Sequence, residues 1–253
     1  MKLAALTHPA AKARIDAGCV ALLPVGATEA HGPHLPLDTD VRIAEEMCRR
    51  ALATLGERLG LEGVVLPSIA YSVTEYAGPF TGTIGVPAEA AKAYLTAVLI
   101  GAAAQGFRAV CLVNAHLEPA HRFVLRDAAS AAREVAACPV VIADPCDRRW
   151  VSRLTPEFQS GKCHAGQYET SLLLAADAPI ERSAMAELPE VDIDLVGAMK
   201  AGLKTFPEMG AASAYFGRPA DATAEEGHRS YAILAEIVSL VLQEALPSST
   251  EAS

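Results

Sequence analysis

Carboxylates and imidazoles are concentrated in one short stretch, GATEAHGPHLPLDTD, which covers residues 26–40. Its glycines and prolines disfavour a helix, and it directly follows an apolar run that is typical of a buried strand. Glu29 and His31 stand two residues apart, as do His116 and Glu118 after a second apolar run. In an extended chain residues i and i+2 point the same way, so both pairs can face one common space.

Three further residues can join these pairs. Asp40 closes the first stretch, and His164 and Glu169 lie in the later segment CHAGQYET. The result is a pool of nitrogen and oxygen donors without a convincing thiolate pair, which suits Zn²⁺, Mn²⁺ or Fe²⁺ better than a soft metal. Because α/β sheets hold ligands at the carboxyl ends of their strands, we expect a metal site there.

Each of these residues, taken alone, has a structural alternative. Asp40 could cap a helix that begins at Val41, and Glu169 could be a first-turn acid stabilised by the helix dipole. A single histidine is more often a core or loop residue than a ligand, and a single glutamate is usually solvated. Joint occurrence at consecutive strand ends favours the metal site. Of the other histidines, His34 is expected to be a neighbour of the site or a loop group, and no role is assigned to His8, His121 and His228.

A sheet is needed to bring these residues together. Short apolar runs rich in β-branched residues predict strands within residues 19–26, 63–72, 108–115 and 139–145. Helical periodicity or helix-start signals mark residues 41–60, 87–107, 119–137 and 222–246, with Pro87 and Pro119 expected in first turns. The alternation predicts an α/β protein with one sheet covered on both faces. We expect one domain over residues 1–246 and a disordered tail over residues 247–253.

Composition narrows the class of protein. The net charge of −9 over 253 residues argues against a nucleic-acid partner or an anionic membrane, because phosphates would be repelled. The N-terminus lacks the apolar core of a signal peptide, and no apolar run is long enough to span a bilayer. Six cysteines occur singly, which predicts reduced, mostly buried thiols and a cytoplasmic location.

The segment LLPVGATEAHGPHLPLDTD resembles the signature of the creatininase (creatinine amidohydrolase) family. Four later segments match in order, namely FTGTI, VNAHLEPAH, HAGQYETS and FGRPADATAEEG, so the similarity covers nearly the whole chain. The resemblance implies a three-layer α/β/α sandwich with a mostly parallel sheet, assembled as a homohexamer. It also implies two divalent ions per chain, Zn²⁺, Mn²⁺ or Fe²⁺, that act on C–N bonds.

The resemblance further implies a role for each site residue. By position, the implied metal ligands are Glu29, His31, Asp40, His116 and Glu169. Glu29 and His116 would hold one ion, and Asp40 would bridge it to the second. His31 and a further glutamate would hold that second ion; Glu169 is preferred, and Glu118 is the alternative.

His164 matches the family's active-site histidine, and Glu118 would otherwise act as a proton carrier. Two cations can share a bridging water and make it hydroxide-like, ready to attack a carbonyl carbon. His164 or Glu118 would then protonate the departing nitrogen. The expected function is hydrolysis of a C–N bond in a small polar molecule, of the cyclic amide or formamide type.

Departures from the family pattern concern the substrate. Ser160 stands in the region where the creatinine hydrolases keep a tryptophan, and Leu117 and Pro119 alter the third motif. These changes weaken creatinine itself as the substrate. The same scaffold could instead cleave a C–C bond of a cyclic polyol ketone or trim a peptide. A non-catalytic assembly subunit is the third alternative.

Overall fold

The structure is a computed structural model that describes residues 1–246. The tail for which disorder was predicted, residues 247–253, lies outside the described residues. Four strands form one parallel sheet in the order β2-β1-β3-β4. The strands are β1 (Val20–Val25), β2 (Gly63–Val65), β3 (Val110–Asn114) and β4 (Val140–Ala143).

All four predicted strands are present, and each is shorter than its apolar run. β1 and β3 are buried along their whole length, because apolar side chains on both faces of the sheet contact helices. β2 ends at Val65, shortly before Pro67, which has no N–H to donate to a ladder. After an isolated bridge from Ile69 to Val25, the chain leaves the sheet. Residues 72–76 therefore pass over the carboxyl ends of β1 and β3.

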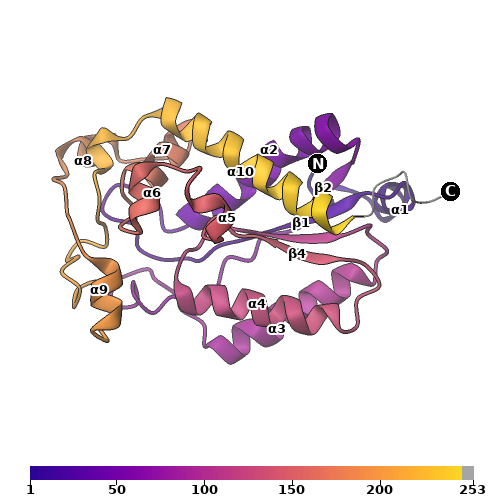
Figure 1. Ribbon diagram of the computed structural model, residues 1–253, viewed down its shortest axis with the longest axis horizontal. Helices are drawn as coiled ribbons and strands as arrows, with labels where there is room; N and C mark the ends of the chain where they lie inside the picture. The colour runs from indigo at the N-terminus through magenta and orange to yellow at the C-terminus, as the bar shows by residue number, and fades with distance from the viewer. Residues whose placement is uncertain (247–253) are drawn as a thin grey trace.

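Helices cover both faces of the sheet (Figure 1). On one face lie α2 (Thr39–Leu59), α7 (Gln167–Ala175) and α10 (Ala224–Ala245), and on the other lie α3 (Ala88–Ala103) and α4 (Pro119–Arg133). Each face has its own buried apolar cluster, one centred on α2 and α10 and one on α3 and α4. The predicted three-layer α/β/α sandwich is confirmed.

The remaining elements are short. They are α1 (His8–Asp16), α5 (Arg148–Val151), α6 (Pro156–Ser160), α8 (Arg182–Glu187), α9 (Leu195–Lys200) and the 3₁₀ turns η1 (Leu3–Ala5) and η2 (Pro219–Asp221). Helices α8 and α9 lie at the end of the molecule on the left of Figure 1. The loops around α9 form a third apolar cluster, in which Phe206 and Phe216 pack together.

The order of the strands predicts the position of a ligand-binding crevice. The chain runs from β1 outward to β2 through α2, then returns past β1 to β3 through α3 on the other face. β1 and β3 are therefore neighbours whose connections leave in opposite directions, and Val25 pairs with Asn114 at their carboxyl ends. Crevices in open α/β sheets form at such a switch point.

Two helix starts differ from the prediction. α2 begins at Thr39 rather than Val41, with Asp38 before its first residue, so the alternative that Asp40 caps the helix is wrong. Pro119 opens α4 as predicted, but Pro87 precedes α3 instead of lying in its first turn. A proline fits both places because neither needs its N–H.

All six cysteines are free thiols; Cys19, Cys48 and Cys111 are buried and the other three are half-buried. Among the helices of residues 1–246, none has the length and apolar character that crossing a bilayer requires.

Candidate metal centre

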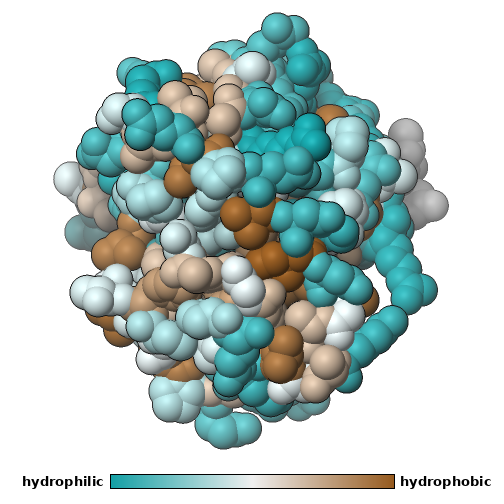
Figure 2. Space-filling model, turned by 90° about the vertical axis from the view of Figure 1, so that its left-hand side faces the viewer, coloured by the Kyte–Doolittle hydropathy of each residue, from teal (hydrophilic) through white to brown (hydrophobic). Residues whose placement is uncertain are grey.

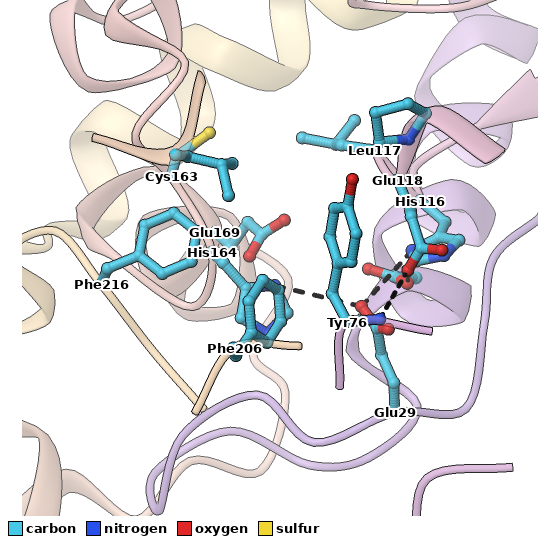
Figure 3. A pocket seen from close by; sticks show the side chains of 13 residues that line it. Glu29, Tyr76, His116, Leu117, Glu118, Cys163, His164, Glu169, Phe206 and Phe216 are labelled. Carbon is cyan, nitrogen blue, oxygen red and sulfur yellow. Dashed lines mark hydrogen bonds and ion pairs between the residues drawn. The ribbon is translucent and has the colours of Figure 1, made fainter. Parts of the chain in front are cut away.

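The seven site residues predicted from the sequence converge at the carboxyl ends of β1 and β3. Glu29 and His31 follow β1, and Asp40 lies in the first turn of α2. His116 and Glu118 follow β3, His164 precedes α7, and Glu169 lies in the first turn of α7. All seven are buried: Glu29, His31, Asp40, His116, Glu118, His164 and Glu169. Six of them, all except His31, line one pocket (Figure 3).

Asp40 lies at the middle of the cluster. Its Oδ1 is 3.2 Å from His31 Nε2, and its Oδ2 is 3.0 Å from His116 Nδ1. Glu29 Oε1 lies 3.4 Å from the same His116 nitrogen and 3.8 Å from His31 Nε2. Glu169 Oε2 also lies 3.8 Å from His31 Nε2. Asp40 thus lies between His31 and His116, with Glu169 near the first histidine and Glu29 near both.

The donor atoms form overlapping groups with the spacing that a cation requires. His31, Asp40 and Glu169 offer one group in which all three ligand atoms lie within 4.8 Å of one another. Two more groups meet the same limit and share Glu29: Glu29 with His116 and Glu118, and Glu29 with His31 and His164. Neighbouring donor groups of this kind can accommodate more than one ion.

Backbone carbonyls fix the orientation of three imidazoles. His31 Nδ1 lies 3.1 Å from the Glu29 carbonyl, His116 Nε2 lies 2.9 Å from the Val73 carbonyl, and His164 Nε2 lies 2.9 Å from the Ala30 carbonyl. A carbonyl oxygen only accepts, so each of these nitrogens carries the proton. In the neutral ring the other nitrogen then faces the carboxylates with a free lone pair. Protein metal sites hold their histidine ligands in this way.

The carboxylates are held by donors of their own. The Thr74 hydroxyl donates to Glu29, and the Ala165 N–H donates to Glu169 Oε2 at 2.6 Å. Glu118 accepts from the N–H groups of Glu75 and Tyr76 at 3.0–3.3 Å. Ala165 has a φ of 49°, a left-handed conformation that is unfavourable for residues other than glycine. In this conformation its N–H points toward Glu169.

Burial and mutual charge shift the pKa values of the cluster in opposite directions. Burial disfavours the charged form of His31, but Asp40, then Glu169 and Glu29, raise its pKa to about 10. Glu29 and Asp40 likewise raise the pKa of His116, and the charges of His31 and His116 lower that of Asp40. Burial raises the pKa of Glu169 to about 7. In the metal-free protein, protonated imidazoles therefore balance buried carboxylates.

The centre fits divalent cations. His31 Nε2 and Asp40 Oδ2 are buried and have no partner aligned for a hydrogen bond, although charged neighbours lie close. Buried polar atoms without partners are costly unless something else binds them. Imidazole nitrogens and carboxylate oxygens suit Zn²⁺, Mn²⁺ and Fe²⁺. The two unpartnered atoms belong to residues at the middle of the donor groups.

Comparison with known proteins agrees with this geometry. A profile of the creatininase family, described as creatinine amidohydrolase, matches residues 4–242. The chain belongs to the creatininase family. It is a creatininase-family hydrolase with candidate metal-binding residues.

Relatives in the creatininase family differ in what they act on. Mycofactocin precursor peptide peptidase of Mycobacterium tuberculosis is 32% identical over 225 residues, which cover 85% of this chain and 81% of that protein. Creatinine amidohydrolase of Pseudomonas putida is 29% identical over 190 residues, which cover 67% of this chain and 69% of that protein.

Solved creatininase structures share the fold. One of creatinine amidohydrolase (creatininase) has a TM-score of 0.73 at 24% identity, covering 97% of this chain and 98% of that one. A structure of creatininase with manganese and a zinc–zinc structure of a creatininase mutant give the same TM-score.

Two glycines of the creatininase motifs explain how the chain closes around the centre. A Cβ on Gly26 would lie 2.8 Å from the Asp40 Cβ, so only glycine lets the start of α2 press against the end of β1. A Cβ on Gly166 would lie 2.6 Å from the Phe216 carbonyl oxygen. This close approach brings the loop before α7 against the strand-like residues that carry Phe216.

Several residues of the site escaped the sequence analysis. Tyr76, Leu195, Phe206 and Phe216 line the pocket, and Phe206 stacks on His164 with ring centroids 4.4 Å apart. Tyr76 and Phe206 come from irregular segments and Leu195 opens the short helix α9, so no periodicity marked them. Phe216 begins the matching segment FGRPADATAEEG, but no role was assigned to it. His34, for which a role as a neighbour of the site was open, is buried, and its Nε2 lies 2.9 Å from the Thr170 hydroxyl.

Proposed function

We propose that this creatininase-family hydrolase uses two divalent ions to cleave an amide C–N bond. The observation that carries the proposal is the position of Asp40, whose two oxygens face His31 on one side and His116 on the other. A carboxylate in this position can serve two cations at once. Dinuclear sites of this kind are suited to hydrolysis.

We assign the ligands by proximity. Glu29 and His116 would hold one ion, His31 and Glu169 the other, and Asp40 both. Support for Glu169 over Glu118 as the partner of His31 comes from the donor groups, in which Glu169 joins His31 and Asp40. Zn²⁺ or Mn²⁺ is favoured, because structures with the same fold are of manganese and zinc–zinc forms.

When bound, two such ions supply Lewis acidity to the substrate carbonyl and to the attacking water. The chain contributes proton transfer. His164 Nδ1 lies 4.0 Å from Glu29 Oε1, and burial together with the charge of His31 lowers the pKa of His164 to about 4. A neutral His164 can accept a proton at Nδ1 and deliver it to the departing nitrogen. Glu118, whose pKa is raised by burial, is the alternative carrier.

The residues that line the pocket indicate which kind of substrate group lies next to the amide bond that is cleaved. Tyr76, Leu117, Leu195 and Phe206 line it, and no lysine or arginine does so among residues 1–246. The empty space is about 410 Å³, a volume that includes open solvent at the mouth. Figure 2 views the end of the molecule that lies on the left of Figure 1, and it shows hydrophobic residues gathered near the middle of that face. The wall favours an amide with an apolar flank.

Peptide hydrolysis is therefore a second candidate within the same chemistry. It is favoured by the 32% identity to the mycofactocin precursor peptide peptidase, which extends over most of both chains. Creatinine hydrolysis has less support, because the match to creatinine amidohydrolase covers only 67% of this chain. In either case we propose a homohexamer, as the family resemblance implies, and a cytoplasmic location, which the singly spaced cysteines favour.

Activity after metal removal tests the proposed function. The protein is stripped with a chelator and assayed, with and without added Zn²⁺ or Mn²⁺, on cyclic amides, formamides, short peptides with apolar ends and cyclic polyol ketones. We expect hydrolysis of amides or peptides only after a metal is restored. Full activity of the stripped protein would contradict the proposal. Turnover of the ketones alone would replace C–N with C–C cleavage, and no turnover with metals bound would support a non-catalytic subunit.

A further inference from the structure

His116 belongs to a closed cycle of hydrogen-bonded residues, and His121 completes the cycle. Asn114, the last residue of β3, accepts from the His116 N–H at 3.1 Å and donates to the His116 carbonyl at 2.9 Å. Its Oδ1 also lies 3.0 Å from His121 Nε2. An amide oxygen only accepts, so His121 Nε2 carries the proton.

The other side of the His121 ring holds residues 72–76. His121 Nδ1 lies 2.6 Å from the Ser72 hydroxyl, and in the neutral ring this nitrogen accepts the Ser72 proton. The next residue, Val73, offers its carbonyl to His116 Nε2 at 2.9 Å. The ring of contacts therefore runs from Asn114 through His116, Val73, Ser72 and His121 back to Asn114.

Residues 72–76 also hold the two glutamates next to His116. The Thr74 hydroxyl donates to Glu29, and the N–H groups of Glu75 and Tyr76 donate to Glu118. One irregular segment thus positions three members of the metal centre. Backbone hydrogen bonds hold both ends of this segment, from the Val86 N–H to the Ser72 carbonyl at 2.9 Å and from the Phe206 N–H to the Tyr76 carbonyl at 2.8 Å. The contact between Ser72 and His121 adds the tie that links the segment to α4 and the end of β3.

His121 is well placed for this task. It is fully buried in the first turn of α4, and its ring lies 4.7 Å from the His116 ring between centroids. Both of its nitrogens are occupied by Asn114 and Ser72, so it has no lone pair left for a cation or a substrate. It also does not line the pocket.

We propose that His121 is a positioning residue that ties residues 72–76 to the end of β3 and so orients His116 and Glu29 toward the cation they would share. The inference rests on the proposed function for the existence of that cation. It adds a residue beyond the proposed ligands and proton carriers. Outer partners of metal-binding histidines typically change metal affinity 10–100-fold when removed.

Equilibrium Zn²⁺ binding to the metal-stripped protein tests the proposal, with the melting temperature measured in parallel. His121→Phe, which fills the space without either hydrogen bond, is expected to weaken the binding of one of the two ions about 10–100-fold. Ser72→Ala should weaken the binding of the same ion, because it removes the hydrogen bond between Ser72 and His121. His121→Gln, which offers an amide N–H to Asn114 and an oxygen to Ser72, should restore most of the lost affinity.

Ser239→Ala is the matched control, because Ser239 is an equally buried hydroxyl in α10 that donates only to the Ala235 carbonyl. It should leave Zn²⁺ affinity at the wild-type value. A lower melting temperature with unchanged Zn²⁺ affinity in His121→Phe would overturn the positioning role, as would a glutamine variant no better than phenylalanine. If His121→Phe does not fold, Ser72→Ala decides alone. Wild-type protein that binds no Zn²⁺ would overturn the metal centre as well.

Discussion

Asp40→Asn is expected to lower the affinity for both divalent ions by more than about 100-fold, since even an outer partner of a ligand is worth 10–100-fold. The amide is nearly isosteric, so the change removes one charge and one acceptor without opening a cavity. Asp40 presents a different oxygen to each of His31 and His116, whereas Glu29 approaches both with the same Oε1 and from farther away. Metal content after dialysis and Zn²⁺ titration measure the effect, and hydrolytic activity should be lost with the ions.

Asp38→Asn is the control for that variant. Asp38 lies two residues earlier at the start of α2, is half exposed, and pairs with Arg42 instead of facing the centre. It should keep both ions. Loss of a single ion in Asp40→Asn, with the second bound at wild-type affinity, would show that Asp40 serves one ion only.

Metal affinity is expected to rise steeply with pH. Burial opposes the charge on His31, but its carboxylate neighbours raise its pKa to about 10, and the pKa of His116 is also raised. At neutral pH both imidazoles of the metal-free protein therefore hold a proton that an incoming ion must displace. Because each ion displaces one imidazole proton, the apparent affinity for each ion increases about 10-fold per pH unit between pH 7 and 9.

Calorimetry in two buffers of different ionisation enthalpy counts the released protons directly. At pH 7 the two imidazoles are expected to release about two protons per chain, and Glu169, whose pKa burial raises to about 7, about half a proton more. The number falls as the pH approaches the raised pKa values of the imidazoles. Unperturbed imidazoles, with pKa near 6.5, would release almost none above pH 7. A flat affinity over pH 7–9 would therefore contradict the charge balance described for the centre.

Sequence patterns predicted the sheet and the convergence of the donors for a simple physical reason. Glu29 and His31 follow one strand and His116 and Glu118 follow its neighbour, and parallel strands end at the same edge. The spacing of two residues in an extended chain then fixes which side chains face each other. Both the i, i+2 spacing and the common edge of parallel strands can be derived from short sequence segments, without information on loops or on contacts between distant residues.

The proposed partner of His31 follows from the family resemblance and not from residue type, by which Glu118 and Glu169 are equally plausible. In the structure α7 and the loop before it bring Glu169 close to His31 and Asp40, which supports the proposal. That approach depends on close contacts between loops far apart in sequence, such as Gly166 against Phe216. Periodicity carries no information on contacts of this kind.

The part played by residues 72–76 was also beyond sequence reasoning. Val73 contributes its carbonyl and Glu75 its N–H, and every residue type except proline offers both groups. His121 lies five residues after His116, outside the spacing that marks a shared face of a strand or helix turn, so no cluster was predicted around it. Its role becomes visible only through the two hydrogen bonds of its ring.

Anomalous diffraction from crystals of the Zn²⁺- or Mn²⁺-loaded protein tests the central claim most directly. The account predicts two metal peaks per chain, one in contact with Glu29 and His116 and one in contact with His31 and Glu169, with Asp40 touching both. A single peak that Asp40 does not contact, or an active protein with no peak at the carboxyl ends of β1 and β3, would contradict it.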